Sequence, residues 1–127
     1  MLRLLLSYTG LPWEDKVYLG PENWFGSGDK SKIGLDFPNL PYLIKGDFKL
    51  TESSAIAKYI VKISNKKELL GKNPEDEGRV DMVLSLLDEI FNPTMALFFS
   101  PNHKTEQKRL FDGKIKDKLD QLEKFVG

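Results

Sequence analysis

The chain has 127 residues, of which 40% are hydrophobic and 30% charged, a composition typical of a globular domain and unlike that of a disordered segment. Its 19 basic and 19 acidic residues cancel, so no net charge favours nucleic acid or an anionic membrane as a partner. With no cysteine, the chain itself forms no disulfide, thiolate metal site or cysteine nucleophile, and any sulfur chemistry would use sulfur from a ligand.

The first third of the chain reads as a helix, a strand and a loop. Residues 2–8 are rich in leucine and are followed by Gly10 and Pro12, which predicts a helix that stops there. The stretch "WEDKVYL", residues 13–19, predicts a short strand. Residues 20–35 contain four glycines, a proline and several charges, which indicates a loop.

Residues 41–63 predict a hairpin that leads into a helix. Two short strands, 41–44 and 48–50, flank Gly46, and glycine allows the positive φ that a tight turn requires. From Ser54 the apolar period changes, since Ile56, Ile60 and Ile63 fall on one helical face.

The second half predicts a pair of antiparallel helices after a polar boundary at 64–78. Asn73, followed by Pro74 and three acidic residues, is typical of a capped helix start, and this helix extends to about Phe99. Pro93 predicts a kink or a break near Asn92. A last amphipathic helix is predicted over about 105–125. We therefore expect two domains, an α/β domain over 1–66 and an all-α hairpin over 67–127.

The candidate site lies in "NLPYLIKGDFKLTESSAI", residues 39–56. A cis bond before Pro41 would turn the backbone groups of Leu40 outward, where an extended peptide pairs with them. Eleven residues later, Glu52 and Ser53 stand at a helix start, where free N–H groups favour a carboxylate and Glu52 suits a neighbouring ammonium. These features suit a γ-glutamyl peptide; the alternative is a proline-led strand followed by an ordinary Ser/Thr cap.

The block "IGLDFPNLPYLIKGDFKLTESSAI" resembles the mu-class glutathione S-transferases nearly residue for residue, and "LRLLLSYTG" and "GRVDMV" are similar to their first and fourth helices. The resemblance implies a thioredoxin-like N-terminal domain and a helical C-terminal domain. It also implies that Asn39, Leu40, cis Pro41, Glu52 and Ser53 bind glutathione. Trp24 and Lys30 match the residues that hold the glycine carboxylate. Asp88 or Glu89 corresponds to an acid that reaches the ligand from the partner subunit, although either also suits a surface charge.

By the same resemblance, the chain starts after the family's first strand, which carries the catalytic tyrosine, and stops before its last helices. No catalytic residue is therefore expected within it, and the thioredoxin-like domain would be incomplete. Tyr8 matches a tyrosine at a packing position in the family's first helix. Two functions stay open, namely conjugation of glutathione to small electrophiles and a catalytically degenerate subunit with a structural or binding role. The expected partners are glutathione and a second copy or a larger complex, with no nucleic acid, no membrane insertion and no metal. The cytoplasm is the default compartment, and the apolar start with Arg3 leaves mitochondria as the alternative.

Overall fold

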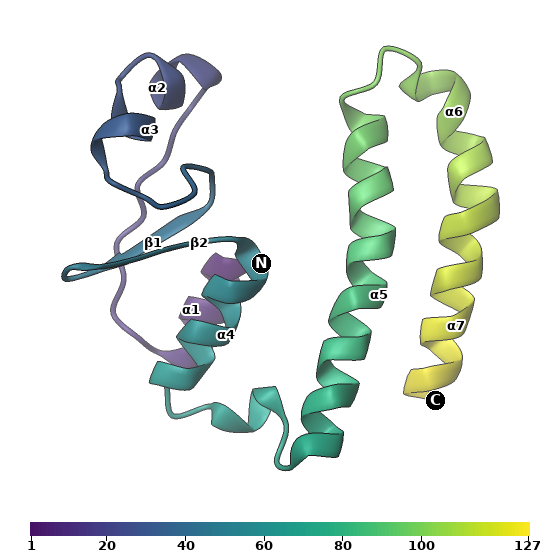
Figure 1. The fold of residues 1–127 in the computed structure, drawn as a ribbon. Coiled ribbons are helices and arrows are strands. Elements are labelled where there is room, and N and C mark those ends of the chain that lie inside the picture. The colour runs from purple at the N-terminus through teal and green to yellow at the C-terminus, as the bar shows by residue number, and fades with distance from the viewer. The chain divides into compact units, whose positions relative to one another are not determined.

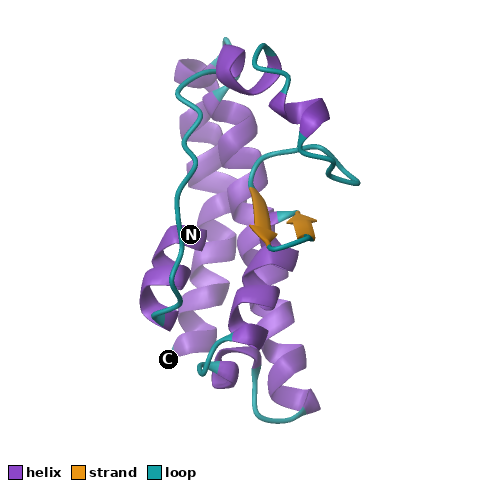
Figure 2. Cartoon of the chain, turned by 90° about the vertical axis from the view of Figure 1, so that its left-hand side faces the viewer, coloured by secondary structure: helices purple, strands orange, loops and turns teal.

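The computed structural model describes residues 1–127 as two compact units, Met1–Leu70 and Gly71–Gly127. The first unit combines helices with a single β-hairpin, and the second is entirely helical. Figure 1 shows the elements in chain order, and Figure 2 shows that the hairpin holds the only strands.

The first unit opens with α1, Leu2–Thr9, as the leucine pattern predicts. The helix ends where Gly10 adopts φ 69°, and the Gly10 N–H donates to the Leu6 carbonyl oxygen at 3.1 Å. Tyr8, in contrast, is 60% exposed, so the predicted packing position is wrong. Its ring lies instead 5.5 Å from the ammonium nitrogen of Lys66.

The predicted strand over 13–19 is wrong, because this stretch is irregular backbone. A strand is defined by ladder hydrogen bonds to a neighbour, and the sheet contains only β1, Tyr42–Lys45, and β2, Phe48–Thr51. These two strands confirm the predicted hairpin within one residue at each end. The composition of residues 13–19 suits a strand, but the segment has no ladder partner in the sheet.

The stretch 20–35, predicted as a loop, contains two short helices, α2, Pro21–Phe25, and α3, Asp29–Lys32. Pro21 occupies the first turn of α2, where its fixed φ suits a helix and its missing N–H costs nothing. Asp29 lies in the first turn of α3, where a carboxylate interacts favourably with the positive end of the helix dipole. Local start signals therefore outweigh the glycine-rich composition.

Helix α4, Ser53–Ile63, supplies most of the core of the first unit. Ile56 and Ile60 are 1% and 0% exposed, and α4 contacts α1 and both strands. This confirms the predicted apolar face at Ile56 and Ile60, whereas Ile63, predicted on the same face, is 37% exposed. A short 3₁₀ turn, η1, Lys67–Leu70, follows and ends the unit.

The second unit begins with α5, Pro74–Phe98, whose cap is the one that the sequence predicts. The Asn73 side-chain oxygen accepts a hydrogen bond of 2.9 Å from the Asp76 N–H. Of the kink or break predicted near Asn92, the break is wrong, because α5 continues through Pro93 to Phe98. Proline removes one backbone hydrogen bond, and the turns on either side keep theirs.

The predicted last helix is divided into three parts, α6, His103–Leu110, the π-helical turn η2, Phe111–Ile115, and α7, Lys116–Val126. Gly113 interrupts the helix with φ −107° and ψ −109°. Helices α6 and α7 return alongside α5 as an antiparallel pair, as predicted (Figure 1). None of the helices combines the length and apolar character that a bilayer crossing requires.

Candidate functional site

The register of the hairpin brings the two halves of the predicted site to one end of the ladder. Tyr42 pairs with Thr51 and Lys45 with Phe48, across a turn in which Gly46 has φ 58°. Pro41 and Glu52 are the next residues beyond the Tyr42–Thr51 pair. They therefore flank the same end of the sheet although eleven positions separate them.

The Leu40–Pro41 peptide bond is cis, as predicted. Asn39, Leu40 and Pro41 are all exposed. The Leu40 N–H donates to the side-chain oxygen of Asn39 at 2.9 Å, while no hydrogen bond engages the Leu40 carbonyl oxygen. One of the two backbone groups that a peptide ligand would use is thus open, and the other is held by a neighbouring side chain.

The start of α4 has no side-chain cap. Its N-cap residue is Glu52, whose carbonyl oxygen accepts the first helical hydrogen bond, from the Ile56 N–H at 2.9 Å. The N–H groups of the first turn, from Ser53 onward, consequently lack a backbone acceptor. The alternative of an ordinary Ser/Thr cap is therefore wrong, and the first turn presents free donors beside the Glu52 carboxylate.

Glu52 also has the one positive φ outside glycine, at 69° with ψ 117°. A side chain in this region crowds the following carbonyl oxygen, so the conformation costs free energy. The neighbouring helix and hairpin impose it, since both begin or end at this residue.

Trp24 lies beside the same end of the hairpin. Its ring stacks on Tyr42 with centroids 5.9 Å apart and meets the Tyr18 ring edge-on at 5.2 Å. The side chain is 4% exposed, and its indole N–H has no hydrogen-bond partner. No buried side-chain nitrogen or oxygen lacks a partner, so the indole N–H is in contact with solvent. It is a donor that an external group can use.

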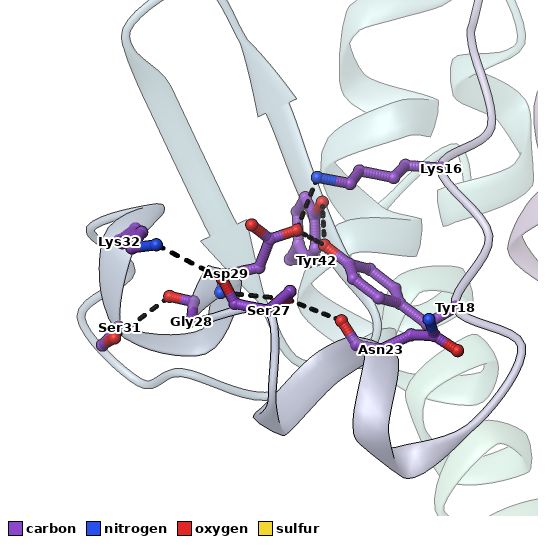
Figure 3. Close-up of polar contacts among 9 residues, drawn as sticks. All are labelled: Lys16, Tyr18, Asn23, Ser27, Gly28, Asp29, Ser31, Lys32 and Tyr42. Atoms are coloured by element: carbon purple, nitrogen blue, oxygen red, sulfur yellow. Dashed lines mark hydrogen bonds and ion pairs between the residues drawn. The ribbon is translucent and has the colours of Figure 1, made fainter.

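A polar network at Tyr18 holds the loop that carries Trp24 (Figure 3). The Tyr18 hydroxyl donates to the Asp29 carboxylate at 2.9 Å and lies 3.0 Å from the Tyr42 hydroxyl. Lys16 donates to the same Asp29 oxygen at 2.6 Å. Sequence reasoning missed this network. The pattern Lys-x-Tyr followed by a loop aspartate carries no spacing that is specific to it.

The network shifts the titration of its members. The Lys16 ammonium, followed by the Tyr18 hydroxyl, lowers the pKa of Asp29 below its ordinary value. Burial, followed by the hydrogen bond to Tyr42, raises the pKa of Tyr18 to about 12. The hydrogen bond to Asp29 raises the pKa of Lys16. At neutral pH the network therefore contains the Asp29 carboxylate, the Lys16 ammonium and the neutral hydroxyl of Tyr18.

Of the remaining predicted site residues, Lys30 and Glu89 each have a ring or ion-pair partner, and Asp88 has neither. The Lys30 ammonium lies 4.8 Å from the centroid of the Phe25 ring, on the loop that carries Trp24. In α5, the Glu89 carboxylate pairs with Lys118 at 2.8 Å, and this ammonium lowers the pKa of Glu89. Asp88 is exposed and makes no hydrogen bond or ion pair, so it is the freer of the two acids.

The site thus offers donors and acceptors for both ends of a charged peptide. The α4 start and the Trp24 indole suit carboxylates, Glu52 suits an ammonium, and the Leu40 carbonyl oxygen suits a peptide N–H. These groups come from three separate segments of the first unit, namely the α2 region, the Leu40–Pro41 segment before β1 and the β2–α4 junction.

Comparison with known proteins identifies the family. Residues 1–62 match the family model described as glutathione S-transferase, N-terminal domain. Glutathione S-transferase 2 of Gallus gallus is 37% identical over 133 residues, which cover 99% of this chain and 58% of the relative. Glutathione S-transferase Mu 4 of Mus musculus is 37% identical over 139 residues, covering 99% of the chain and 62% of the relative.

The chain spans about three fifths of the length of these relatives, given the 58% and 62% coverage. The family match, the hairpin-and-helix first unit and the helical second unit together confirm the expected fold class, a thioredoxin-like α/β part followed by helices. The first unit therefore matches the N-terminal domain of the glutathione S-transferase family, and the chain as a whole resembles the mu class.

Proposed function

We propose that this chain binds glutathione at the Pro41–Glu52 end of the hairpin and serves an enzyme that transfers glutathione to small electrophiles. The observation that carries the proposal is the register, which brings the Leu40 carbonyl oxygen and the uncapped start of α4 to one place. The names of the similar proteins, all glutathione S-transferases, support it.

Each residue has a role that follows from the chemistry of the tripeptide. The γ-glutamyl end carries an ammonium and a carboxylate, which we assign to Glu52 and to Ser53 with the free N–H groups of α4. The cysteinyl backbone would pair with Leu40 beside cis Pro41, and Asn39 would release the Leu40 N–H for this purpose. The glycine carboxylate is assigned to the Trp24 indole and Lys30.

A second copy of the chain is the proposed partner, and Asp88 the residue it contributes. Glu89 is already paired with Lys118, so Asp88 has the carboxylate that is available to a ligand bound on another subunit. We assign the glutathione-binding domain to residues 1–66 and the helical domain to 67–127, and the cytoplasm as compartment.

A second candidate is a glutathione-binding subunit without transferase activity, in which none of the four tyrosines of the chain activates the thiol. A tyrosine that activates a thiol must offer its hydroxyl to sulfur. Tyr18 and Tyr42 bond to each other, Tyr59 packs on Phe48 at 4.7 Å, and Tyr8 is exposed on α1. We assign no catalytic residue within 1–127.

The test measures binding and turnover separately. The purified chain is titrated with glutathione by calorimetry and then assayed for conjugation of a chromogenic aryl halide. Binding with turnover supports the transferase, and binding without turnover supports the second candidate. Absence of binding would sink both.

Ser53→Ala, with Ser54→Ala as its matched control, tests the placement of the ligand. Both serines lie in the first turn of α4, and neither side chain caps the helix. We expect Ser53→Ala to weaken glutathione binding roughly fivefold, the effect of losing one hydrogen bond to a charged group, and Ser54→Ala to leave it unchanged. Equal effects would contradict the assignment of the carboxylate to Ser53.

A further inference from the structure

The direction of the hydrogen bonds around Tyr18 follows from a count of protons. Asp29 is ionised at neutral pH and has no proton to give, so the single hydroxyl proton of Tyr18 lies on the bond to Asp29. The 3.0 Å contact between the two hydroxyls then has Tyr42 as its donor. The result is a directed chain from Tyr42 through Tyr18 to Asp29 (Figure 3).

This chain fixes the two rings that enclose Trp24. Tyr42 lies against the indole face with an interplanar angle of 23°, and Tyr18 meets its edge at 74°. Because the Tyr18 hydroxyl is bonded on both sides, the two tyrosine rings keep a fixed distance from each other, with centroids 6.4 Å apart. The orientation of the indole N–H depends on both.

The same chain ties the two short helices of the loop together. The Asp29 N–H, at the start of α3, donates to the Ser27 hydroxyl at 3.2 Å. That hydroxyl donates to the Asn23 carbonyl oxygen of α2 at 2.7 Å. Asp29 is therefore linked to α2 through Ser27 and is bonded directly to Tyr18. Trp24 of α2 and Lys30 of α3 thus lie on a loop whose two helices are held together by these hydrogen bonds.

We propose that Tyr18 is a positioning residue of the glutathione site. Its hydroxyl braces the loop between Asp29 and Tyr42, and this sets the affinity for the glycine carboxylate of the tripeptide through Trp24 and Lys30. The inference rests on the proposed function. It adds a residue that does not touch the ligand and that acts on one end of it only.

The test compares glutathione with its glycine monoethyl ester, which lacks the charge on that end. All proteins carry Trp13→Phe, so that Trp24 is the single remaining tryptophan and its emission reports on the loop. Tyr18→Phe keeps the ring and removes the hydroxyl. We expect it to weaken glutathione binding roughly fivefold to tenfold and to leave binding of the ester unchanged, as calorimetry would measure.

Matched variants make the outcome decisive. Tyr8→Phe makes the same change at an exposed hydroxyl without hydrogen bonds and should have no effect. Asp29→Ala should reproduce Tyr18→Phe, whereas Asp29→Asn keeps an acceptor for Tyr18 and should restore most of the affinity. Far-ultraviolet circular dichroism and Trp24 emission verify that each variant is folded.

Two results would overturn the inference. If Tyr18→Phe weakens both ligands equally, or neither, the hydroxyl supports the fold at most and does not set carboxylate affinity. If the Trp13→Phe protein and the unaltered chain both fail to bind either ligand, the proposed function itself is wrong and the positioning role is lost with it.

Discussion

The positive φ of Glu52 allows backbone strain and ligand binding to be measured at one residue. Glu52→Ala removes the carboxylate and keeps the strain, whereas Glu52→Gly removes both, since glycine adopts φ 69° freely. An L-residue in the left-handed region costs about 1–2 kcal/mol, and glycine loses about 0.5–1 kcal/mol more chain entropy on folding. Glu52→Gly should therefore be more stable than Glu52→Ala by about 0.5–1 kcal/mol.

Urea denaturation followed by tryptophan emission measures this difference in the right unit, because Trp13 and Trp24 both lie within Met1–Leu70. With a slope of about 1 kcal/mol per molar, the midpoint for glycine should lie about 0.5–1 M above that for alanine. Both variants should lose glutathione affinity alike, by roughly tenfold, because each removes the charge assigned to the ammonium.

The predicted stability difference and the predicted loss of affinity can be refuted separately. If Glu52→Ala proves as stable as Glu52→Gly, the backbone at this position is not strained. If either variant binds glutathione as tightly as the unaltered chain, the carboxylate does not contact the ligand, whatever the stabilities are.

The remaining predictions concern the core and the pH dependence. Ile60→Ala should cost about 2–5 kcal/mol, because Ile60 is fully buried, and Ile63→Ala on the same helix should cost far less because Ile63 is 37% exposed; similar urea midpoints would contradict the proposed core. Asp29 has a lowered pKa, so its stabilisation is present above the ordinary carboxyl pKa and is lost as the pH falls through the lowered value. Tyr18 has a pKa raised to about 12, so its contribution is complete below the ordinary pKa of 10.0 and is lost as the pH rises through 12. The urea midpoint should accordingly be flat from about pH 5 to 9, and a slope near pH 7 that disappears in Asp29→Ala would contradict this assignment.

Elements with local signals could be predicted from the sequence. The cap at Asn73 depends on residues within one turn, and the structure has it with a 2.9 Å hydrogen bond. The hairpin around Gly46 depends on a two-residue turn, and the α4 face depends on apolar spacing. In each case the physical cause and the sequence signal lie within a few residues of each other.

Elements that depend on distant partners could not be predicted in the same way. Residues 13–19 include residue types that favour strands, but strand formation requires a neighbouring backbone that the local sequence does not specify. Pro93 has a strong local penalty that the length of α5 outweighs. The π-helical turn at Gly113 is a further case, since glycine permits an irregular backbone but does not by itself predict one.

The residues of the candidate site also fall into two groups, those with a local sequence signal and those that depend on distant partners. Pro41, Glu52 and Ser53 were identified from motif and resemblance, and the register explains why they meet. Tyr18 and Asp29 were missed because side-chain hydrogen bonds between segments leave no periodic pattern. For the start of α4 the sequence left two alternatives open, free N–H groups or an ordinary Ser/Thr cap, and the structure has no side-chain cap.

The short sequence distances within the Tyr18 network bear on how quickly the site assembles as the chain folds. Its longest link, between the Tyr18 and Tyr42 hydroxyls, joins residues 24 positions apart. The entropic cost of closing a loop rises only with the logarithm of its length, and contacts of low sequence separation generally form early. All members of the network lie within Met1–Leu70, so a nascent chain can form these hydrogen bonds before residues 71–127 are synthesised.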